Sequence, residues 1–161
     1  QNGGCGYVLK PSAALKLTPL KPVTFKFRIL SGSCLPKPDG AATGETIDPY
    51  VQVVSHDVVT KEDGKEEYTS STFYNKCVPD NGFCPVWNES EFQSFDIQNP
   101  EMAMIQFTLM EEDVGLDDKV GHAVIPFRCL RRGYRAINLY HKHGTRTGPF
   151  SVASLLVEID Y

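Results

Sequence analysis

Alternation of apolar and polar residues is the dominant pattern along most of the chain. Phe25, Phe27 and Ile29 alternate with polar residues, which places one face of a strand against a core and the other face in water. Seven further short runs are rich in β-branched and aromatic residues and are separated by turn-forming stretches. The runs that we expect to form strands are residues 25–30, 50–55, 68–74, 92–97, 105–110, 120–127, 134–140 and 154–161.

Eight short strands separated by turns predict an all-β fold, an antiparallel eight-stranded β-sandwich. Helix signals are weak, and residues 13–17 and 127–131 predict a short turn each. Period-two alternation predicts a core made of Phe25, Phe27, Ile29, Val51, Val53, Trp87, Phe107, Leu109, Val124, Leu155 and Val157. Because each strand of such a sandwich reverses direction, alternate connections lie at the same end. The connections expected to share one end are residues 31–48, 75–91, 111–119 and 141–153.

The chain divides into two unequal parts. Residues 1–22 contain three prolines and little periodicity, which indicates a connecting segment, and residues 23–161 form the predicted domain. A length of 161 residues with 41% hydrophobic residues suits one globular domain with its own core. The chain starts with Gln1 and not with Met, so we expect a fragment of a longer protein. Its five cysteines show no CxxC pair and no zinc spacing, which favours reduced thiols in a cytosolic protein.

Charge is unevenly distributed although the net charge is only −4. Residues 1–38 contain six Lys or Arg and no acid, whereas residues 39–118 contain eighteen Asp or Glu against three Lys. Residues 119–161 return to seven basic residues against two acids. An acidic middle argues against a nucleic-acid partner, which would need a basic face. It suggests that the middle binds a cation.

Acidic side chains concentrate in the connections that are expected to share one end. Carboxylates crowded in this way repel one another unless a cation lies among them, and calcium takes six to eight oxygen ligands in a flexible geometry. Charge alone leaves open a second interpretation, in which these acids form only a solvated rim. The residues concerned are Asp39, Glu45, Asp48, Asp80, Asn81, Glu111, Glu112, Asp113, Asp117 and Asp118.

Three motifs resemble those of C2 domains. Residues 47–51 (IDPYV) resemble the DPYV signature that follows the first calcium loop, and residues 81–89 (NGFCPVWNE) resemble the second-loop stretch. Residues 113–118, followed by Val120 and Gly121, resemble the third loop and the strand that leaves it. The resemblance covers residues 23–161 in the order of the family. It implies the type II strand permutation, in which the domain starts directly with residues 25–30.

A second resemblance indicates the parent protein. Residues 2–11 (NGGCGYVLKP) are similar to the last strand of the catalytic barrel of phosphoinositide-specific phospholipase C. Residues 130–135 and 153–159 resemble late segments of the C2 domain in that family. The resemblance places residues 1–22 at the end of the barrel with its linker. The family's catalytic residues lie in the barrel upstream, so we expect no phosphodiesterase activity from this chain alone, although the parent resembled is a hydrolase.

The resemblance implies calcium-dependent binding to an anionic phospholipid membrane, which docks the phospholipase on its phosphoinositide substrate surface. The implied partners are this membrane and the catalytic barrel of the same polypeptide, at the cytoplasmic side of the plasma membrane. The family's third-loop motif begins with Asp where Glu111 stands here. The implied calcium ligands are Asp48, Asp113 and Asp118, with contributions from Asn81, Glu111 and the carbonyl of Thr46.

Membrane contacts are expected from the same end of the domain. Val114 and Leu116, between the third-loop acids, either enter the headgroup layer or pack within their loop. Lys142 and Arg146 of the fourth connection either meet lipid phosphates or remain solvated.

Two alternatives stay open. In the first, the domain is a calcium-independent structural module that braces the catalytic barrel and binds protein. In the second, it is a secreted adhesion sandwich, which would need paired cysteines.

Overall fold

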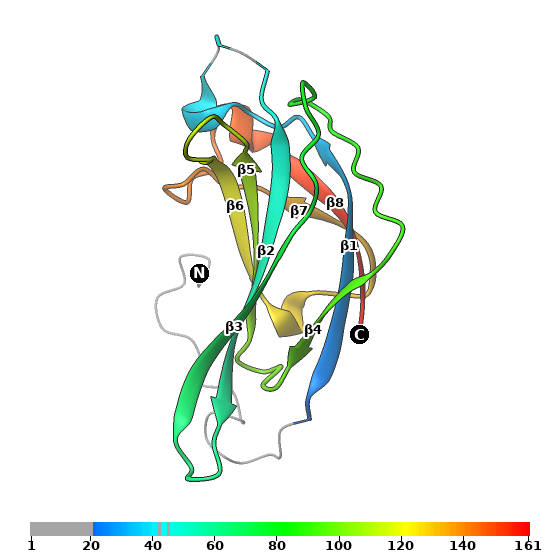
Figure 1. Ribbon diagram of the computed structural model, residues 1–161, viewed down its shortest axis with the longest axis vertical. Coiled ribbons are helices and arrows are strands. Elements are labelled where there is room, and N and C mark those ends of the chain that lie inside the picture. The colour runs from blue at the N-terminus through cyan, green and yellow to red at the C-terminus, as the bar shows by residue number, and fades with distance from the viewer. Residues whose placement is uncertain (1–20, 42, 45) are drawn as a thin grey trace.

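The computed structural model describes residues 21–41, 43–44 and 46–161 (Figure 1). The predicted turn at residues 13–17 and most of the segment 1–22 lie outside the described residues. The predicted turn at residues 127–131 appears as a short 3-10 helix. The described elements, in chain order, are β1 (Val23–Ser33), η2 (Pro38–Gly40), β2 (Pro49–Thr60), β3 (Glu66–Tyr74), β4 (Gln93–Ile97), β5 (Met104–Glu111), β6 (Asp118–Pro126), η3 (Phe127–Cys129), β7 (Gly133–Asn138), η4 (Gly148–Ser151) and β8 (Ser154–Asp160).

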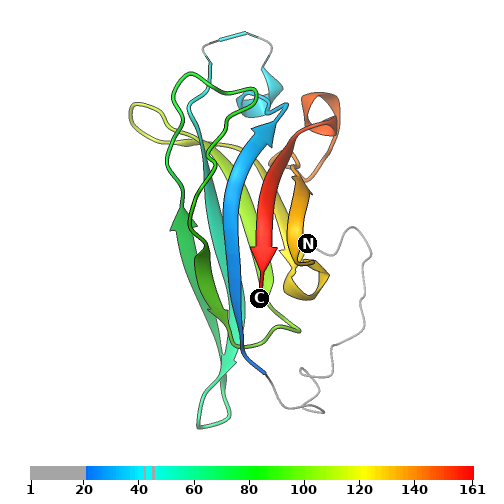
Figure 2. The ribbon, with the colours of Figure 1, turned by 90° about the vertical axis from the view of Figure 1, so that its right-hand side faces the viewer.

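The strands form two four-stranded sheets with the orders β4-β1-β8-β7 and β3-β2-β5-β6. Every pairing between neighbouring strands is antiparallel. Figure 2 looks onto the first sheet, where β1, β8 and β7 lie side by side. The predicted antiparallel eight-stranded sandwich is confirmed, and each predicted run overlaps one observed strand.

The core lies between the two sheets and has a cluster of aromatic rings at its centre. Phe27 of β1 is fully buried, and its ring lies 5.2 Å from that of Phe25 and 5.1 Å from that of Phe95 on β4. From the opposite sheet, Phe73 meets Phe27 edge-on at 5.6 Å. Such ring pairs stabilise a fold beyond their buried area, so this cluster joins the two layers.

The predicted core is confirmed at nine of eleven positions and differs at two. Trp87 is only partly buried and packs against the edge of the core. The prediction for Val124 is wrong, because this residue is half-buried on the outer face of β6, opposite Gln106. A β-bulge at Val120 adds one residue to β6 and reverses the alternation beyond it, so Ala123 faces the core in place of Val124.

Four connections gather at one end of the sandwich, at the top of Figure 1, and we call this the loop end. They are loop 1 (residues 34–48), loop 2 (residues 75–92), loop 3 (residues 112–117) and loop 4 (residues 139–153). Hydrogen bonds join them, including Glu112 N to the carbonyl of Asp48 at 3.0 Å. The expected sharing of one end is therefore confirmed. No helix among the described residues is long and apolar enough to cross a membrane.

Candidate metal site at the loop end

An acidic pocket of about 490 Å³ opens at the loop end, between loops 1, 2 and 3. All but one of its lining residues carry a side-chain oxygen. They are Thr46, Asp48, Asp80, Glu111, Glu112, Asp113 and Val114.

Asp48 of loop 1 connects the three loops through hydrogen bonds. Its side-chain Oδ1 accepts a hydrogen bond of 2.7 Å from the backbone N–H of Asp80 in loop 2. Its backbone carbonyl accepts the N–H of Glu112 in loop 3. Pro49 follows at once and begins β2, so the start of a rigid strand fixes the position of Asp48. The pocket is thus built on the sheet itself.

The conformation of loop 3 is stabilised by hydrogen bonds to its own carboxylates. Oδ1 of Asp113 accepts the N–H of Val114 at 2.6 Å, and Oδ1 of Asp117 accepts the N–H of Asp113 at 3.3 Å. Oδ2 of Asp117 accepts the hydroxyl of Tyr50 at 2.6 Å, which ties the loop to β2. Burial, together with this hydrogen bond to Asp117, raises the pKa of Tyr50 above its ordinary value. Tyr50 therefore acts as a neutral donor at physiological pH.

The structure brings four of the six predicted ligands together. Thr46, Asp48, Glu111 and Asp113 all line the pocket. Asn81 and Asp118 are exposed and do not line it. Their role as ligands stays a prediction.

Two acids that were not among the predicted ligands also line the pocket. Asp80 lies one residue before Asn81, and Glu112 lies between Glu111 and Asp113. The acidic stretches indicated this region of the chain, but they did not show which of their residues line the pocket. Asp80 adopts a positive φ of 55°, which helps turn loop 2 toward Asp48.

The pKa of the Cys77 thiol reflects the negative charges at the loop end. Burial is the main cause that raises the pKa of its thiol to about 12, and a hydrogen bond with Glu112 adds to it. The negative charges of Asp48 and Asp117 act in the same direction. The thiol therefore stays protonated at neutral pH. The carboxylates around it repel one another, and a bound cation would reduce this repulsion.

The donors of the pocket suit a hard cation that prefers oxygen, and calcium is the ion whose flexible coordination fits such a set. Within the described ranges, no three His, Cys, Asp or Glu side chains are grouped closely enough to hold a metal ion. The pocket is therefore an oxygen-lined opening and not a closed cage.

The predicted membrane-contact residues differ in their surroundings. Val114 and Leu116 are fully or almost fully exposed, so they project from loop 3 and do not pack within it. Lys142 donates to Asp39 of loop 1 at 2.6 Å, and His141 lies 3.3 Å from the same carboxylate.

Arg146 is half-buried, and one of its terminal nitrogens donates to Oδ1 of Asn138 at 3.1 Å. Both predicted basic contacts, Lys142 and Arg146, thus already have a partner within the domain.

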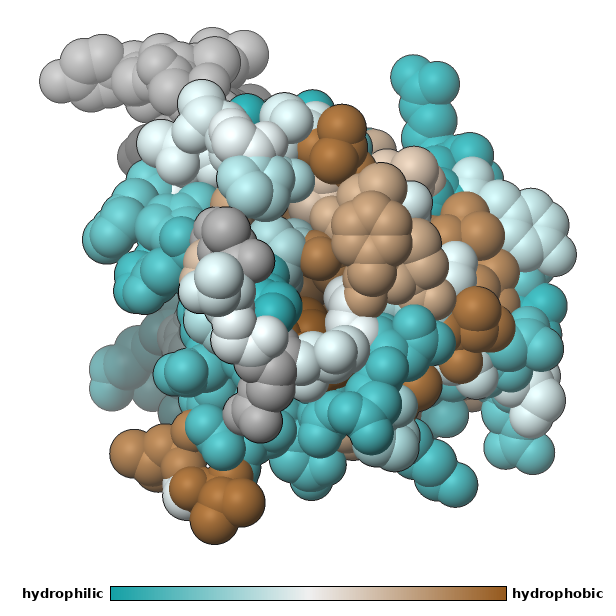
Figure 3. Space-filling view, turned by 90° about the horizontal axis from the view of Figure 1, so that it is seen from above, coloured by the Kyte–Doolittle hydropathy of each residue, from teal (hydrophilic) through white to brown (hydrophobic). Residues whose placement is uncertain are grey.

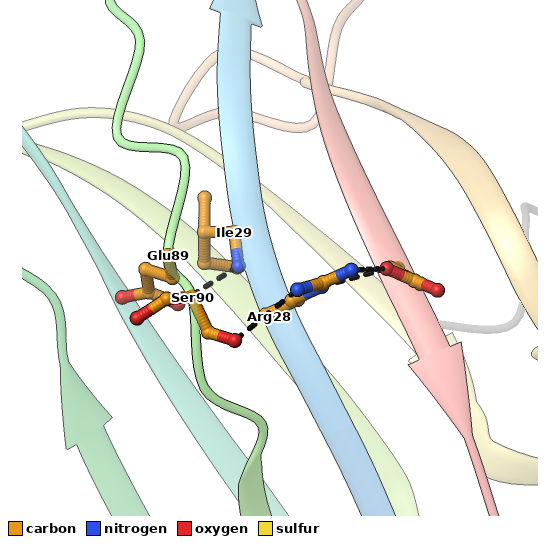
Figure 4. Close-up of polar contacts among 5 residues, drawn as sticks. Arg28, Ile29, Glu89 and Ser90 are labelled. Atoms are coloured by element: carbon orange, nitrogen blue, oxygen red, sulfur yellow. Dashed lines mark hydrogen bonds and ion pairs between the residues drawn. The ribbon is translucent and has the colours of Figure 1, made fainter.

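Loop 2 is held against β1 below the pocket. The carboxylate of Glu89 accepts the backbone N–H of Ile29 at 2.9 Å, and the carbonyl of Ser90 accepts Nη1 of Arg28 at 3.2 Å (Figure 4). Arg28 in turn donates to Glu158 of β8 at 2.6 Å. The descending part of loop 2 is therefore bound along the sheet.

Comparison with known proteins identifies the family. Residues 23–142 match the C2 domain family. The chain is also 39% identical over 153 residues to human inactive phospholipase C-like protein 1, a match that covers 86% of this chain and 13% of that protein. The chain is a C2 domain of the phospholipase C family. Human 1-phosphatidylinositol 4,5-bisphosphate phosphodiesterase delta-4 is 34% identical over 163 residues, covering 94% of this chain and 20% of that enzyme.

Solved structures agree with this assignment. The crystal structure of L. pealei PLC21 matches with a TM-score of 0.71 and 26% identity, over 96% of this chain and 19% of that chain. A C2 domain of plant extended synaptotagmin 1 shares the fold, with a TM-score of 0.57 and 19% identity, over 86% of this chain and 94% of that chain. The C2 domain described here spans between 13% and 20% of the length of its phospholipase relatives.

Proposed function

We propose that this C2 domain binds calcium in the pocket at its loop end and thereby docks on anionic phospholipid membranes. The observation that carries the proposal is the pocket itself, whose lining residues come from three loops of the sandwich and, apart from Val114, carry side-chain oxygens. Thr46, Asp48, Glu111 and Asp113 are the residues that would hold the ion, with Asp80 and Glu112 beside them.

The chain's own residues contribute charge, position and apolar contact. Without a cation, the carboxylates of the pocket repel an anionic surface. Bound calcium reverses this local field and shares its coordination with lipid phosphate or carboxylate. Val114 lines the pocket and is fully exposed, so it stands where a docked headgroup layer would begin. Leu116 extends the same apolar tip.

Membrane docking by this domain would position the larger protein that contains it. Its relatives include a phosphodiesterase named for phosphatidylinositol 4,5-bisphosphate. We infer that the domain holds a phosphoinositide-specific phospholipase C hydrolase, through the adjoining catalytic barrel, on its substrate at the cytoplasmic face of the plasma membrane. Residues 1–22, for which we propose the end of that barrel, would form the connection.

A calcium-independent role as a bracing and protein-binding module is the second candidate. Two observations favour it. No closed metal cage is grouped within the described residues, and relatives at 39% identity are named as inactive phospholipase C-like proteins. A brace needs no calcium response, which separates the two candidates.

The test measures calcium and membrane binding of the chain and one charge-removing variant. Calorimetry should show calcium binding, and co-sedimentation with phosphatidylserine-containing vesicles should require calcium. Asp113→Asn keeps the side-chain shape and removes one pocket charge, so it should weaken both by roughly tenfold or more, as loss of an ionised ligand does. Asp63→Asn, in the hairpin between β2 and β3 at the opposite end, is the matched control and should change neither.

If the chain binds these vesicles equally well in chelator, or if Asp113→Asn behaves as wild type, the calcium mechanism is wrong and the bracing role takes its place. A domain that neither binds calcium nor sediments with vesicles leads to the same conclusion.

A further inference from the structure

Two cysteines lie opposite each other where loop 2 runs beside the start of loop 1. The N–H of Leu35 donates to the carbonyl of Phe83 at 2.9 Å. Cys34 is the residue before this donor, and Cys84 is the residue after the acceptor. In an antiparallel ladder, a bond in this position flanks a pair of directly opposed residues whose Cα atoms lie about 4.5 Å apart. The backbone therefore places Cys34 opposite Cys84.

The two cysteines share the outer side of this stretch. An added Cβ at Gly32 would lie 3.1 Å from Cγ of Pro85, and both of these residues are buried, so they form the inner side. Cys84 precedes Pro85 and is exposed, as the alternation of an extended backbone requires. The exposed hydroxyl of Ser33 donates to Sγ of Cys34 at 3.7 Å. Both thiols therefore lie on the outer side.

The pairing of the backbones is incomplete at this point. The second bond of the opposed pair would need an N–H at position 85, and Pro85 has none. Between this pair and the next bridge, Ser31 with Val86, the β1 side has two intervening residues and the loop 2 side has one. Cys34 accommodates the extra residue with a φ of 52°, a conformation that glycine adopts at such bulges and other residues rarely do. A disulfide would supply a link where the hydrogen bonds leave a gap.

The spacing of this pair suits a disulfide. The Cα atoms of bridged cysteines lie roughly 4.4–6.8 Å apart, a range that includes the spacing of directly opposed residues. The other two free thiols of the described residues are less suited. Cys77 stays protonated because of its raised pKa, and Cys129 lies in η3 at the opposite end of the sandwich. Cys34 and Cys84 are therefore the pair that a disulfide would join.

Small molecules can reach this pair from solvent. Figure 3, which looks down on the loop end, shows apolar groups that lie apart with hydrophilic atoms between them. Cys84 is exposed, and Cys34 is partly buried. Exposed disulfides are among the labile ones, which form and break by exchange with other thiols and disulfides. A bond at this position would therefore be reversible.

We propose that Cys34 and Cys84 form a reversible disulfide that locks loop 2 to loop 1 under oxidising conditions. The oxidant is a small-molecule disulfide, with glutathione disulfide as the probe. The thiolate of Cys84 attacks one of its sulfurs and displaces one glutathione, and the thiolate of Cys34 then attacks Sγ of Cys84 and displaces the other. One protein disulfide forms, and the two protons of the cysteine thiols pass to the two glutathione thiolates that leave.

The bridge would act on two loops that line the acidic pocket. Asp80 lies four residues before Cys84 in loop 2, and Asp48 is the last residue of loop 1. The disulfide would link these loops in addition to the hydrogen bond from Asp80 N–H to Asp48. The step uses neither calcium nor lipid, so the inference goes beyond the proposed function and does not rest on it.

The first experiment maps the bond. The chain is equilibrated with glutathione disulfide, its remaining thiols are blocked with N-ethylmaleimide, and it is digested with trypsin and an Asp-specific protease. Cleavage at Asp80 separates Cys84 from Cys77, so mass spectrometry identifies the bonded residue. The number of free thiols should fall by two from the five of the chain, and a peptide pair that joins Cys34 to Cys84 should appear in monomeric protein.

The second experiment measures the locking of the loops. Oxidation should raise Tm by roughly 10 °C, because the bond closes a loop of about 50 residues in the unfolded chain, and dithiothreitol should reverse the rise. Cys84→Ser should lose this response. Cys129→Ser, which removes another exposed thiol at the opposite end, is the matched control and should respond as wild type.

Several results would overturn the inference. They are a thiol count that stays at five, a bond between other cysteines, a mixed disulfide with glutathione that does not resolve, and a disulfide-linked dimer. A bond between Cys34 and Cys84 that leaves Tm unchanged would overturn the locking of the loops. Because no measurement here involves calcium or vesicles, failure of the proposed function leaves this inference standing, and the reverse also holds.

Discussion

Lys142 of loop 4 donates a 2.6 Å hydrogen bond to the carboxylate of Asp39 in loop 1, and this pair joins the two loops at the loop end. The bond to Lys142 is the main cause that holds the pKa of Asp39 below its ordinary value, and His141 adds to it. The carboxyl of Asp39 is therefore ionised at neutral pH. The negative charge of Asp39 therefore partly offsets the positive charge of Lys142 when the domain is not bound to a membrane.

Removing the acid of this pair should strengthen membrane binding. Asp39→Asn removes a negative charge and leaves Lys142 free to meet anionic lipid, which is worth about 1 kcal/mol per basic residue near such a surface, or roughly fivefold in affinity. Co-sedimentation with phosphatidylserine vesicles at low salt measures the gain. In a Lys142→Met background the same substitution should have a smaller effect. An equal gain in both backgrounds would show that the ion pair does not restrain Lys142.

Glu89 predicts a pH-dependent effect on stability. Burial raises the pKa of its carboxyl above the ordinary value, against a smaller opposing effect of the hydrogen bond from Ile29 N–H. A raised folded-state pKa means that the ionised carboxylate destabilises the fold at neutral pH, and that this cost is gone once the pH is below the unfolded-state value of about 4.3. Glu89→Gln keeps an acceptor for Ile29 and should raise Tm at pH 7 by about one or two degrees.

At about pH 4 the two proteins should melt together. Because Glu89 is only half-buried, solvent keeps the effect small. Thermal melts of both proteins from pH 4 to pH 7 measure it, and a gap that widens toward low pH would contradict the sign.

Asp57 should be a strong determinant of stability. This residue is buried, and its carboxylate accepts the backbone N–H groups of Val58 at 2.8 Å and Gln98 at 2.6 Å, with Asn99 at 3.2 Å. It therefore fixes the turn between β4 and β5. Asp57→Ala leaves one buried and two partly buried donors without this acceptor and should cost about 3 kcal/mol of unfolding free energy in urea. Asp57→Asn keeps one acceptor oxygen and should cost less; equal losses would argue against the hydrogen bonds.

Phe27 should be the costliest of the aromatic core residues to remove. It meets rings from β1, β4 and β3 and so contacts both sheets. Phe27→Ala should destabilise the domain by about 4 kcal/mol through lost transfer energy and the cavity left behind. Phe27→Leu refills most of that volume and should recover more than half of the loss in the same urea titration. A loss below about 1 kcal/mol for the alanine variant would contradict the central position of this ring.

Much of the fold could be predicted because its signals are local. The alternation through Phe25, Phe27 and Ile29 identified β1, and strand parity placed loops 1 to 4 at one end. The face of Val124 could not be predicted in this way. An extra residue at Val120 reverses the faces of β6, and nothing in a period-two pattern marks a bulge before the partner strand is in place.

The sequence by itself determined the sandwich, its family and the end at which the acids collect, because each depends on spacing along the chain. Only the tertiary structure decided which acids face the pocket. Asp80 and not Asn81 lines the pocket, where its backbone N–H is bonded to Asp48 from another loop. Phe83 is exposed for the same kind of reason, since its backbone pairs with Leu35 and leaves the ring outside. The direction of a loop side chain follows from contacts between distant segments, and these exist only after the two sheets have packed.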